Sequence, residues 1–248
     1  MDKNTSLVAI ISGGSGLVGS AIAHKLAEDG YAVALLCHKA VGKAETIIRN
    51  LPGKNHAAFA CDITKEDGTR TILKKIARMG VIKVCVHSAA SPLERKRVLD
   101  LSLESFRKEF DVNVFGGFNL FQTAVPYMDK EGGILIGITT AALEFSHAVG
   151  KMGGYIPAKS ALRGLLAVLA KELSLSNIRV FAVAPGFIPG GINADLPEHV
   201  FKFIREKNIS KLESPEDVAG AVSFLCSDKA SSLSGLSLLV SSGETSVL

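Results

Sequence analysis

Tyr155 and Lys159 stand four residues apart near the start of a helix-forming segment, within the run Gly153-Gly154-Tyr155-Ile156-Pro157-Ala158-Lys159. Residues at i and i+4 share a helix face, so we expect the lysine ammonium to approach the tyrosine phenol. A nearby positive charge favours an ionised phenol and would move its pKa from about 10 toward working pH. Such a pair can act as general acid and base on a carbonyl group. The spacing also occurs by chance on solvated helix faces, so other parts of the chain must support it.

A glycine-rich turn follows the first apolar segment of the chain. The run Ser12-Gly13-Gly14-Ser15-Gly16-Leu17-Val18-Gly19 leads directly into a helix-forming segment. Glycines allow a tight turn and let backbone N–H groups approach a pyrophosphate, which a helix N-terminus also attracts. A plain strand-to-helix connection is the alternative. The position of the turn after the first strand favours nucleotide binding.

The end of the second apolar segment bears on which dinucleotide would bind. It reads Leu36-Cys37-His38-Lys39, without the acidic residue that usually contacts the adenine ribose hydroxyls. Lys39 can pair with a 2′-phosphate, together with His38 and, as a further candidate cation, Lys43. This favours NADP(H). These cations are otherwise solvated residues at a helix start. Asp62 can accept from the adenine amino group or cap the helix that follows it.

Apolar runs and helix-period segments alternate along the chain. We expect strands at Leu7–Ser12, Ala32–Cys37, Ala57–Cys61, Ile82–Val86, Ile134–Thr139, Ile178–Val183 and Leu236–Val240. Helices are expected at Leu17–Glu28, Lys43–Asn50, Lys65–Arg78, Leu103–Met128, Tyr155–Leu175, Pro197–Lys207 and Pro215–Ser227. This order predicts an α/β fold: a doubly wound, Rossmann-type, parallel seven-stranded sheet with helices on both faces. Residues 1–248 are expected to form a single dinucleotide-binding and catalytic domain. Ligands of such sheets bind at the carboxyl ends of the strands.

Composition limits the classes of function. The 248 residues are 47% hydrophobic and 21% charged, and no apolar run reaches the length of a membrane span. A short apolar run after the N-terminus does not suit a secretory signal, so we expect a cytoplasmic protein. The net charge of +4 is modest, and Arg95-Lys96-Arg97 is interpreted as a solvated loop or helix start, not a nucleic-acid site. The four cysteines lack metal-like spacing, so neither a metal site nor a disulfide framework is expected.

The order of these motifs resembles the short-chain dehydrogenase/reductase family, in its compact single-domain branch. The resemblance rests on the glycine turn, Asp62, Asn113, the Tyr155/Lys159 pair and Pro185-Gly186, and it covers nearly the whole chain. The runs Ser214-Pro215-Glu216-Asp217-Val218-Ala219 and Phe224-Leu225-Cys226-Ser227-Asp228-Lys229-Ala230-Ser231 look like those of 3-oxoacyl-carrier-protein reductases. The stretch from Gly30 to Lys39 also looks like that of NADPH-dependent pteridine reductases.

The resemblance implies a role for each catalytic candidate. Tyr155 would be the general acid that protonates a carbonyl oxygen, and Lys159 would hold the nicotinamide ribose and lower the tyrosine pKa. Asn113 would help to hold a water-linked proton relay. Thr140 takes the place of the family's serine and would donate to the substrate carbonyl, with Thr139 as the alternative. The implied NADP(H) contacts are Gly13, Ser15, Gly16, Leu17, Val18, Gly19, His38, Lys39, Asp62, Ile63, Ser88, Ala89, Ala90, Tyr155, Lys159, Pro185, Gly186 and Ile188.

The chain departs from the family pattern at several points. Leu17 replaces a glycine of the usual turn, and His87-Ser88-Ala89-Ala90 replaces Asn-Asn-Ala-Gly. Thr140 lies fifteen positions before Tyr155, about two more than is common, so an inserted loop must bring them together. The usual Asp-Gly-Gly near the C-terminus is Ser241-Ser242-Gly243.

The leading hypothesis is an NADP(H)-dependent reductase of a 3-oxoacyl thioester or related ketone. A pteridine or quinone-type reductase, a non-catalytic NADP(H)-sensing module, and an epimerase or dehydratase are the alternatives. An apolar substrate lid is expected near residues 187–210. Two helix-forming segments carry more apolar surface than their own sheet can bury: Leu103–Met128, with its phenylalanines, and Ala161–Leu173. The resemblance implies that this surface is buried in a homodimer or homotetramer.

Overall fold

The chain folds around one fully parallel, seven-stranded sheet. The computed structural model describes residues 6–128, 132–144, 150–207 and 212–243. The strands are β1 (Leu7–Ser12), β2 (Ala32–Cys37), β3 (Ala57–Ala60), β4 (Val81–His87), β5 (Gly133–Ile138), β6 (Ile178–Pro185) and β7 (Leu236–Val240). Their order is β3-β2-β1-β4-β5-β6-β7, and every adjacent pair is parallel. The predicted doubly wound α/β fold is confirmed.

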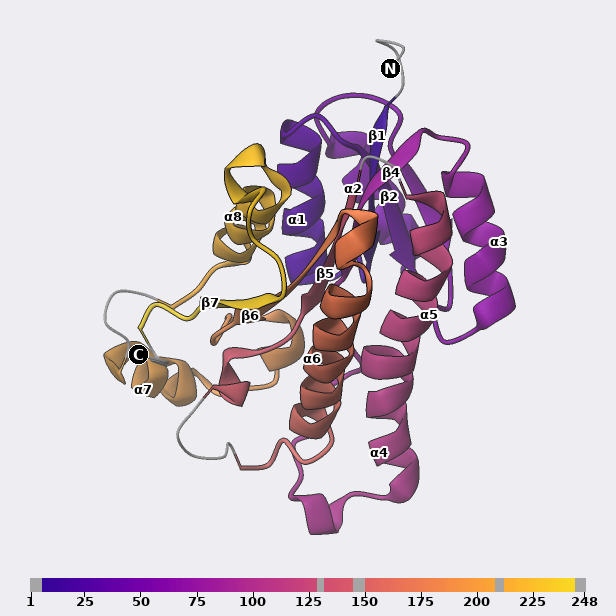
Figure 1. Cartoon of the computed structure of the whole chain (residues 1–248). Helices are drawn as coiled ribbons and strands as arrows, with labels where there is room; N and C mark the ends of the chain where they lie inside the picture. Colours follow the sequence, from indigo (N-terminus) through magenta and orange to yellow (C-terminus); the bar gives the residue numbers. More distant parts are fainter. Residues whose placement is uncertain (1–5, 129–131, 145–149, 208–211, 244–248) are drawn as a thin grey trace.

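Helices cover both faces of this sheet (Figure 1). One layer holds α1 (Leu17–Glu28), α2 (Val41–Asn50) and α8 (Pro215–Cys226), and its core includes Ile22, Leu26, Ala44, Val218 and Val222. The other holds α3 (Glu66–Ile76), α4 (Leu103–Phe110), α5 (Gly116–Ala124) and α6 (Tyr155–Glu172), with Leu73, Leu120, Phe121, Leu162 and Leu166 in its core. β2 and β5 are buried along their whole length, which explains their unbroken apolar sequence. Among the described helices, none is both long and apolar enough to cross a membrane.

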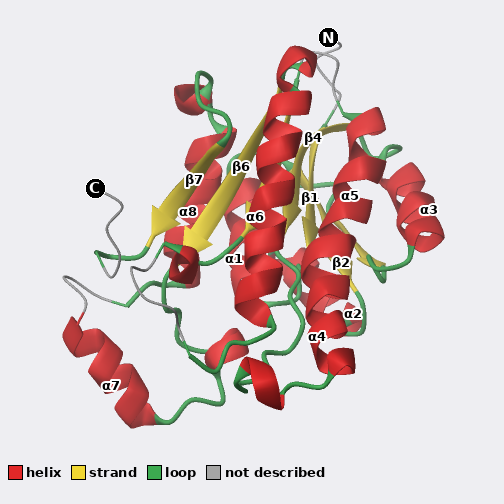
Figure 2. Ribbon diagram, turned by 60° about the horizontal axis from the view of Figure 1, so that its bottom comes forward, coloured by secondary structure: helices red, strands yellow, loops and turns green. Residues whose placement is uncertain are grey.

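The strand order reverses between β1 and β4. The chain first builds outward through β2 and β3, then returns to place β4 on the other side of β1. At such a reversal the connections leave the neighbouring strands in opposite directions and open a crevice at the carboxyl ends. Helix α7 (Glu198–Lys207) lies beyond this same end of the sheet, apart from both helical layers (Figure 2).

The predicted single helix Leu103–Met128 is wrong in two respects. A π-helical turn at Asp111–Phe115 separates α4 from α5, and Val125–Tyr127 forms a 3₁₀ turn. Gly116 and Gly117 follow the π turn, and a Cβ on Gly117 would lie 2.9 Å from the His87 ring. The close approach of this helix to β4 therefore depends on glycine. Because π turns are rare and often occur at functional sites, the position of Asn113 within this one is informative.

Other boundaries differ by a few residues. The second helix begins at Val41, not Lys43, and the third spans Glu66–Ile76, not Lys65–Arg78. Strand β6 runs on to Pro185, and its continuation Gly186 donates its N–H to the Val240 carbonyl (2.8 Å). This extension brings the Pro185-Gly186 turn to the edge of the crevice.

Candidate active site

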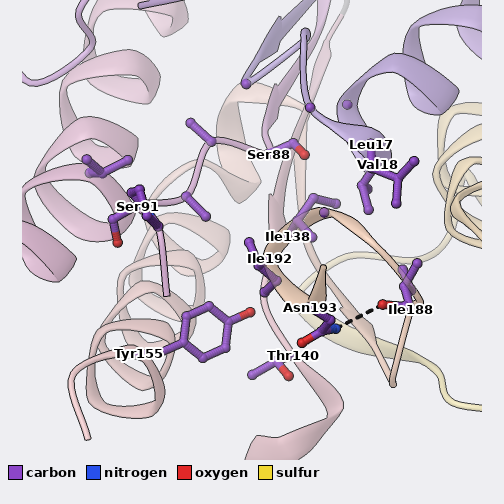
Figure 3. Close-up of a pocket in the computed structure, with 18 of the residues that line it drawn as sticks. Leu17, Val18, Ser88, Ser91, Ile138, Thr140, Tyr155, Ile188, Ile192 and Asn193 are labelled. Atoms are coloured by element: carbon purple, nitrogen blue, oxygen red, sulfur yellow. Dashed lines mark hydrogen bonds between the residues drawn. The ribbon is translucent and has the colours of Figure 1, made fainter. Parts of the chain in front are cut away.

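A cavity of about 920 Å³ occupies the carboxyl ends of the strands (Figure 3). All of the predicted cofactor contacts line it, from Gly13 in the first turn to Ile188 after β6, and so does Thr140. Asn113 does not line the cavity. It is fully buried behind the wall, in the π turn.

The glycine turn is shaped by close backbone contacts. Gly13 has a φ of +68°, and a Cβ there would lie 2.7 Å from the Ala89 Cα. A Cβ on Gly19 would lie 2.4 Å from the Gly13 carbonyl oxygen. Helix α1 begins at Leu17 without a side-chain cap and without an acidic residue in its first turn. The free N–H groups and the positive end of the helix dipole therefore suit a pyrophosphate.

Leu17, which replaces a family glycine, reaches across the cavity mouth. Its side chain approaches Gly190 and Gly191, where added Cβ atoms would lie 3.4 and 3.5 Å from Leu17 atoms. Figure 3 shows Leu17 beside Val18, both extending from the start of α1. The substitution thus links the predicted phosphate turn to the segment predicted to be a lid.

The end of β2 presents the predicted 2′-phosphate residues. Lys39 is exposed and lines the cavity. Lys43 is not among the described residues that line it. His38 Nε2 lies 3.8 Å from Asp62 Oδ2. Asp62 Oδ1 accepts hydrogen bonds from the Thr64 N–H (3.0 Å) and hydroxyl (2.7 Å), so this carboxylate shapes the turn after β3 as well as the cavity wall.

Tyr155 and Lys159 come from the first turns of α6. Tyr155 is 5% exposed, and Lys159 Nζ lies 5.6 Å from the centre of its ring. Burial raises the pKa of the Tyr155 phenol well above its usual range, the Glu109 carboxylate raises it further, and Thr140 lowers it. This direction is opposite to the sequence-based expectation, because removal of water from the phenol outweighs the lowering of its pKa by Thr140 and Arg95. Burial also lowers the pKa of Lys159 to about 8, and its ammonium donates to the Ile138 carbonyl (2.8 Å).

The two threonines after β5 have different partners. Thr139 is 2% exposed, and its hydroxyl donates to the Val183 carbonyl (3.2 Å). The Thr140 hydroxyl accepts from the Ala142 N–H (3.3 Å) and lies at the cavity wall beside Tyr155 (Figure 3). Of the two, Thr140 is therefore the one placed beside the phenol. Residues 145–149 of the expected inserted loop lie outside the described residues.

Asn113 is held by a buried polar network. Its Nδ2 donates to the Glu109 carbonyl (2.9 Å) and to Glu109 Oε2 (3.1 Å), and its Oδ1 has no partner among the described residues. The Asn113 carbonyl accepts from His87 Nε2 (3.1 Å), whose other nitrogen faces the Ser12 hydroxyl (2.9 Å). Since a carbonyl only accepts, the Nε2 of His87 carries the proton. Burial lowers the pKa of His87 to about 3, so the imidazole is neutral.

Two residues of this network, Ser91 and Glu109, were missed by the sequence analysis. The Ser91 hydroxyl, which lines the cavity, donates to Glu109 Oε2, and both side chains are buried. A signal existed, because Glu109 stands four residues before Asn113 and so shares its buried helix face.

Arg95 was also missed, because the cluster Arg95-Lys96-Arg97 was interpreted as solvated. That interpretation is wrong for Arg95, which lines the cavity and bridges to the segment after β6. It donates to Asn193 Oδ1 (2.7 Å), the Ile192 carbonyl (3.2 Å) and Asp195 Oδ2 (3.1 Å). Asn193 in turn donates to the Ile188 carbonyl (2.9 Å). These bonds join the two sides of the cavity mouth.

Comparison with known proteins gives a consistent result. A family model described as "Enoyl-(Acyl carrier protein) reductase" matches residues 15–245. The chain is 33% identical to "Dehydrogenase/reductase SDR family member 4" of Oryctolagus cuniculus, over all of this chain and 96% of that protein. It is 32% identical to the 7alpha-hydroxysteroid dehydrogenase of Escherichia coli strain K12, over 95% of this chain and 92% of that protein.

A solved structure agrees with these sequence matches. It is a 7alpha-hydroxysteroid dehydrogenase complexed with NADH and 7-oxo glycochenodeoxycholic acid. The chain superposes on it with a TM-score of 0.88 at 30% identity, over 96% of this chain and 94% of that one.

Proposed function

The chain belongs to the short-chain dehydrogenase/reductase family of oxidoreductases, and from that premise we propose that it interconverts a carbonyl and a hydroxyl group with NADP(H). One observation carries the proposal. Tyr155, Thr140 and Lys159 line the same cavity as the glycine turn after β1. The proposed proton donor and the proposed dinucleotide site therefore share one cavity.

The cavity fits a nicotinamide dinucleotide. The uncapped start of α1 and the close-packed Gly13 turn would hold the pyrophosphate, Pro185 to Ile188 would lie against the nicotinamide, and Lys159 would hold its ribose. The nicotinamide, when bound, supplies or accepts a hydride. The protein's own residues must then orient the substrate and move the proton.

Tyr155 and Thr140 would act on the substrate oxygen. Because burial raises the pKa of Tyr155, the phenol keeps its proton and can donate it to a carbonyl oxygen that gains charge. The Thr140 hydroxyl accepts from the Ala142 N–H and hydrogen-bonds to Tyr155, so with substrate bound it would donate its own hydrogen to the same oxygen. In the oxidative direction Tyr155 would take the proton back.

Lys39 is the basis for proposing NADP(H). It is exposed, lines the cavity and stands at the end of β2, where a dinucleotide's adenine ribose is expected. A charge-assisted contact to a 2′-phosphate is worth roughly 1.5–3 kcal/mol, so Lys39→Gln should weaken NADPH binding about tenfold or more.

The test of Lys39 is a fluorescence titration with NADPH and NADH. NADH affinity should change little, and Lys43→Gln, which removes a cation outside the cavity lining, should leave both affinities near the wild-type values. Tighter NADH than NADPH binding by the unaltered protein would remove the role given to Lys39.

The substrate end of the cavity is largely apolar. It is formed by Met152, Phe187, Ile192, Leu196 and Val200, and the Phe187 and Phe201 rings pack edge to face at 5.5 Å. A 3-oxoacyl thioester or a related apolar ketone fits this lining. Residues near 187–210, of which 208–210 lie outside the described residues, would act as the lid. A cyclic ketone is the second candidate, because a relative at 30% identity is complexed with a 7-oxo bile acid derivative.

The test is consumption of NADPH and NADH with 3-oxoacyl thioesters, cyclic ketones, pteridines and quinones, for the wild type and for Tyr155→Phe. Turnover that nearly disappears in the variant supports the proposal. Cofactor binding without turnover of any carbonyl would favour a sensing module. Retained cofactor without net oxidation would favour an epimerase or dehydratase.

A further inference from the structure

Glu109 is a buried acid to which the proposed reaction gives no role. It lies in the last turn of α4 and is 5% exposed. Its Oε2 accepts hydrogen bonds from the Ser91 hydroxyl and from Asn113 Nδ2. Two donors on one oxygen stabilise the carboxylate form and fix its direction. Burial still raises the pKa of Glu109, since the group is removed from water.

The Glu109 side chain lies against the start of α6. A Cβ on Gly154 would be 2.8 Å from Glu109 Cγ, so any other residue at position 154 would force the Glu109 side chain to shift. Gly154 directly precedes Tyr155, and Lys159 follows one helical turn later. The carboxylate is thereby packed beneath the turn that carries both catalytic candidates.

The charged groups around Glu109 come from three elements. Lys159 and Tyr155 face it from α6, Glu94 acts on it from the loop after β4, and His87 on β4 is neutral. Arg95, on the same loop, acts on Tyr155 from the cavity side. The acceptor of the Lys159 ammonium is the neutral Ile138 carbonyl, which does not balance its charge. Glu109 is a buried negative charge that acts on this ammonium from α4.

We propose that Glu109 is a positioning residue of the active site, whose carboxylate, fixed by Ser91 and Asn113, keeps Lys159 in its ammonium form. This inference rests on the proposed function, in which the ammonium holds the cofactor ribose. Without Glu109, burial would leave Lys159 neutral over more of the working pH range.

The test is an NMR titration of lysine ε-carbons in isotope-labelled, cofactor-free protein. The Lys159 signal is assigned as the one that is missing in Lys159→Met. Its titration midpoint should lie near pH 8, well below the midpoints of solvated lysines. In Glu109→Gln this midpoint should fall by about one pH unit. Glu109→Asp should restore much of it. Glu104→Gln removes the same charge from the exposed side of α4, where Glu104 pairs with Lys108 (2.7 Å), and should leave it unchanged.

An unchanged or raised Lys159 midpoint in folded Glu109→Gln would overturn the proposal. If that variant does not fold, the wild type provides the test. The chemical shift of the labelled Glu109 carboxyl carbon, followed against pH, must show a second inflection at the Lys159 midpoint. Absence of this inflection would also overturn the proposal.

A second readout is the pH profile of carbonyl reduction. Glu109 raises the pKa of both Lys159 and Tyr155, so its loss should move the alkaline decline in rate to lower pH. A merely structural role would lower the rate without moving the profile. The NMR titration needs no turnover, so the two proposals can fail separately. If the wild type turns over no carbonyl but the Lys159 midpoint falls in Glu109→Gln, only the proposed function is contradicted. If the wild type is active but the midpoint is unchanged in Glu109→Gln, only this inference is contradicted.

Discussion

At Tyr155 opposing effects act on a single phenol. Burial, the largest effect, and the Glu109 carboxylate raise the pKa of the phenol, whereas the Thr140 hydroxyl and the Arg95 guanidinium lower it, so the neutral form is favoured. The neutral phenol is the form that a reductase needs, because it must donate a proton to the substrate oxygen. Sequence spacing indicates which side chains meet, but it does not indicate how much water remains around them.

We expect Thr140→Ala to lower kcat about 100-fold with little change in folding stability. The hydroxyl lies beside Tyr155 at the cavity wall, and loss of one donor to a developing oxyanion typically has an effect of about this size. Steady-state kinetics with any substrate found in the panel measures it. Thr140→Ser keeps the hydroxyl and should recover most of the rate.

Thr139→Val is the matched control for Thr140. Its hydroxyl donates to the Val183 carbonyl within the sheet, so this variant should lose about 1 kcal/mol of stability and keep its kcat. A large kcat loss in Thr139→Val, with a near-normal Thr140→Ala, would exchange the two assignments.

His87 should make the folded protein sensitive to mild acid. Its pKa is lowered from 6.5 to about 3 by burial, so the imidazole stays neutral in the folded state but takes up a proton in the unfolded state below about pH 6.5. The unfolding free energy should therefore fall as the pH falls from 6.5 toward 3, by up to about 5 kcal/mol from this group.

Urea unfolding at a series of pH values measures the effect of His87. His87→Asn keeps a donor for the Asn113 carbonyl but cannot be protonated, so its stability should decline less steeply between pH 6.5 and pH 4. Parallel curves for the two proteins would show that the buried imidazole does not cause the decline.

At the scale of elements, most of the fold could be predicted because buried parallel strands are continuous apolar runs. β1, β2 and β7 have the predicted bounds. The π turn at Asp111–Phe115 could not be predicted, because α and π turns leave nearly the same residues on the buried face and differ by one residue in hydrogen bonding. The glycines that follow it, Gly116 and Gly117, are the sequence feature that marks the place.

Site residues could be predicted where they belong to a short sequence motif. They could not be predicted where their role depends on contacts between segments far apart in the sequence. The glycine turn, Tyr155 and Lys159 line the cavity as expected. Glu109 was missed although its position four residues before Asn113 places it on the same helix face, because that spacing does not show that an acid has buried hydrogen-bond partners. Arg95 was missed because its acceptors stand almost one hundred residues later in the chain.

Arg95 should act as a latch between the loop after β4 and the segment after β6. Loss of its charge-assisted bonds to Asn193 and the Ile192 carbonyl should favour opening of that segment about tenfold. Arg95→Met should raise KM for the carbonyl substrate several-fold and speed limited proteolysis within residues 190–207.

Arg97→Met is the control for the latch. Arg97 is exposed and pairs with Asp100 (2.6 Å) on its own loop, so its loss removes a cation without touching the cavity mouth. Equal proteolysis rates in the two variants would contradict the role given to Arg95.

At the scale of the molecule, the two helical layers differ in how well they are covered. α5 and α6 lie side by side on one face of the sheet (Figures 1 and 2). Phe118 on α5 and Val168 on α6 are 43% and 54% exposed, and Phe115, the last residue of the π turn before α5, is 54% exposed. Phe121, from the same predicted phenylalanine stripe, is fully packed against the sheet. One phenylalanine of this segment therefore lies in the core and two lie in solvent, and the exposed ones are a candidate contact with a second copy.

We expect the protein to form a dimer through α5 and α6, or a tetramer that contains this dimer. Phe118→Glu would place an unpaired charge in the contact and should weaken association about 100-fold or more. Light scattering coupled to size-exclusion chromatography measures the mass. Phe224, 42% exposed on α8 in the opposite layer, distinguishes the two assemblies: Phe224→Glu should leave a dimer unchanged but reduce a tetramer to dimers. A monomeric wild type at micromolar concentration would contradict both.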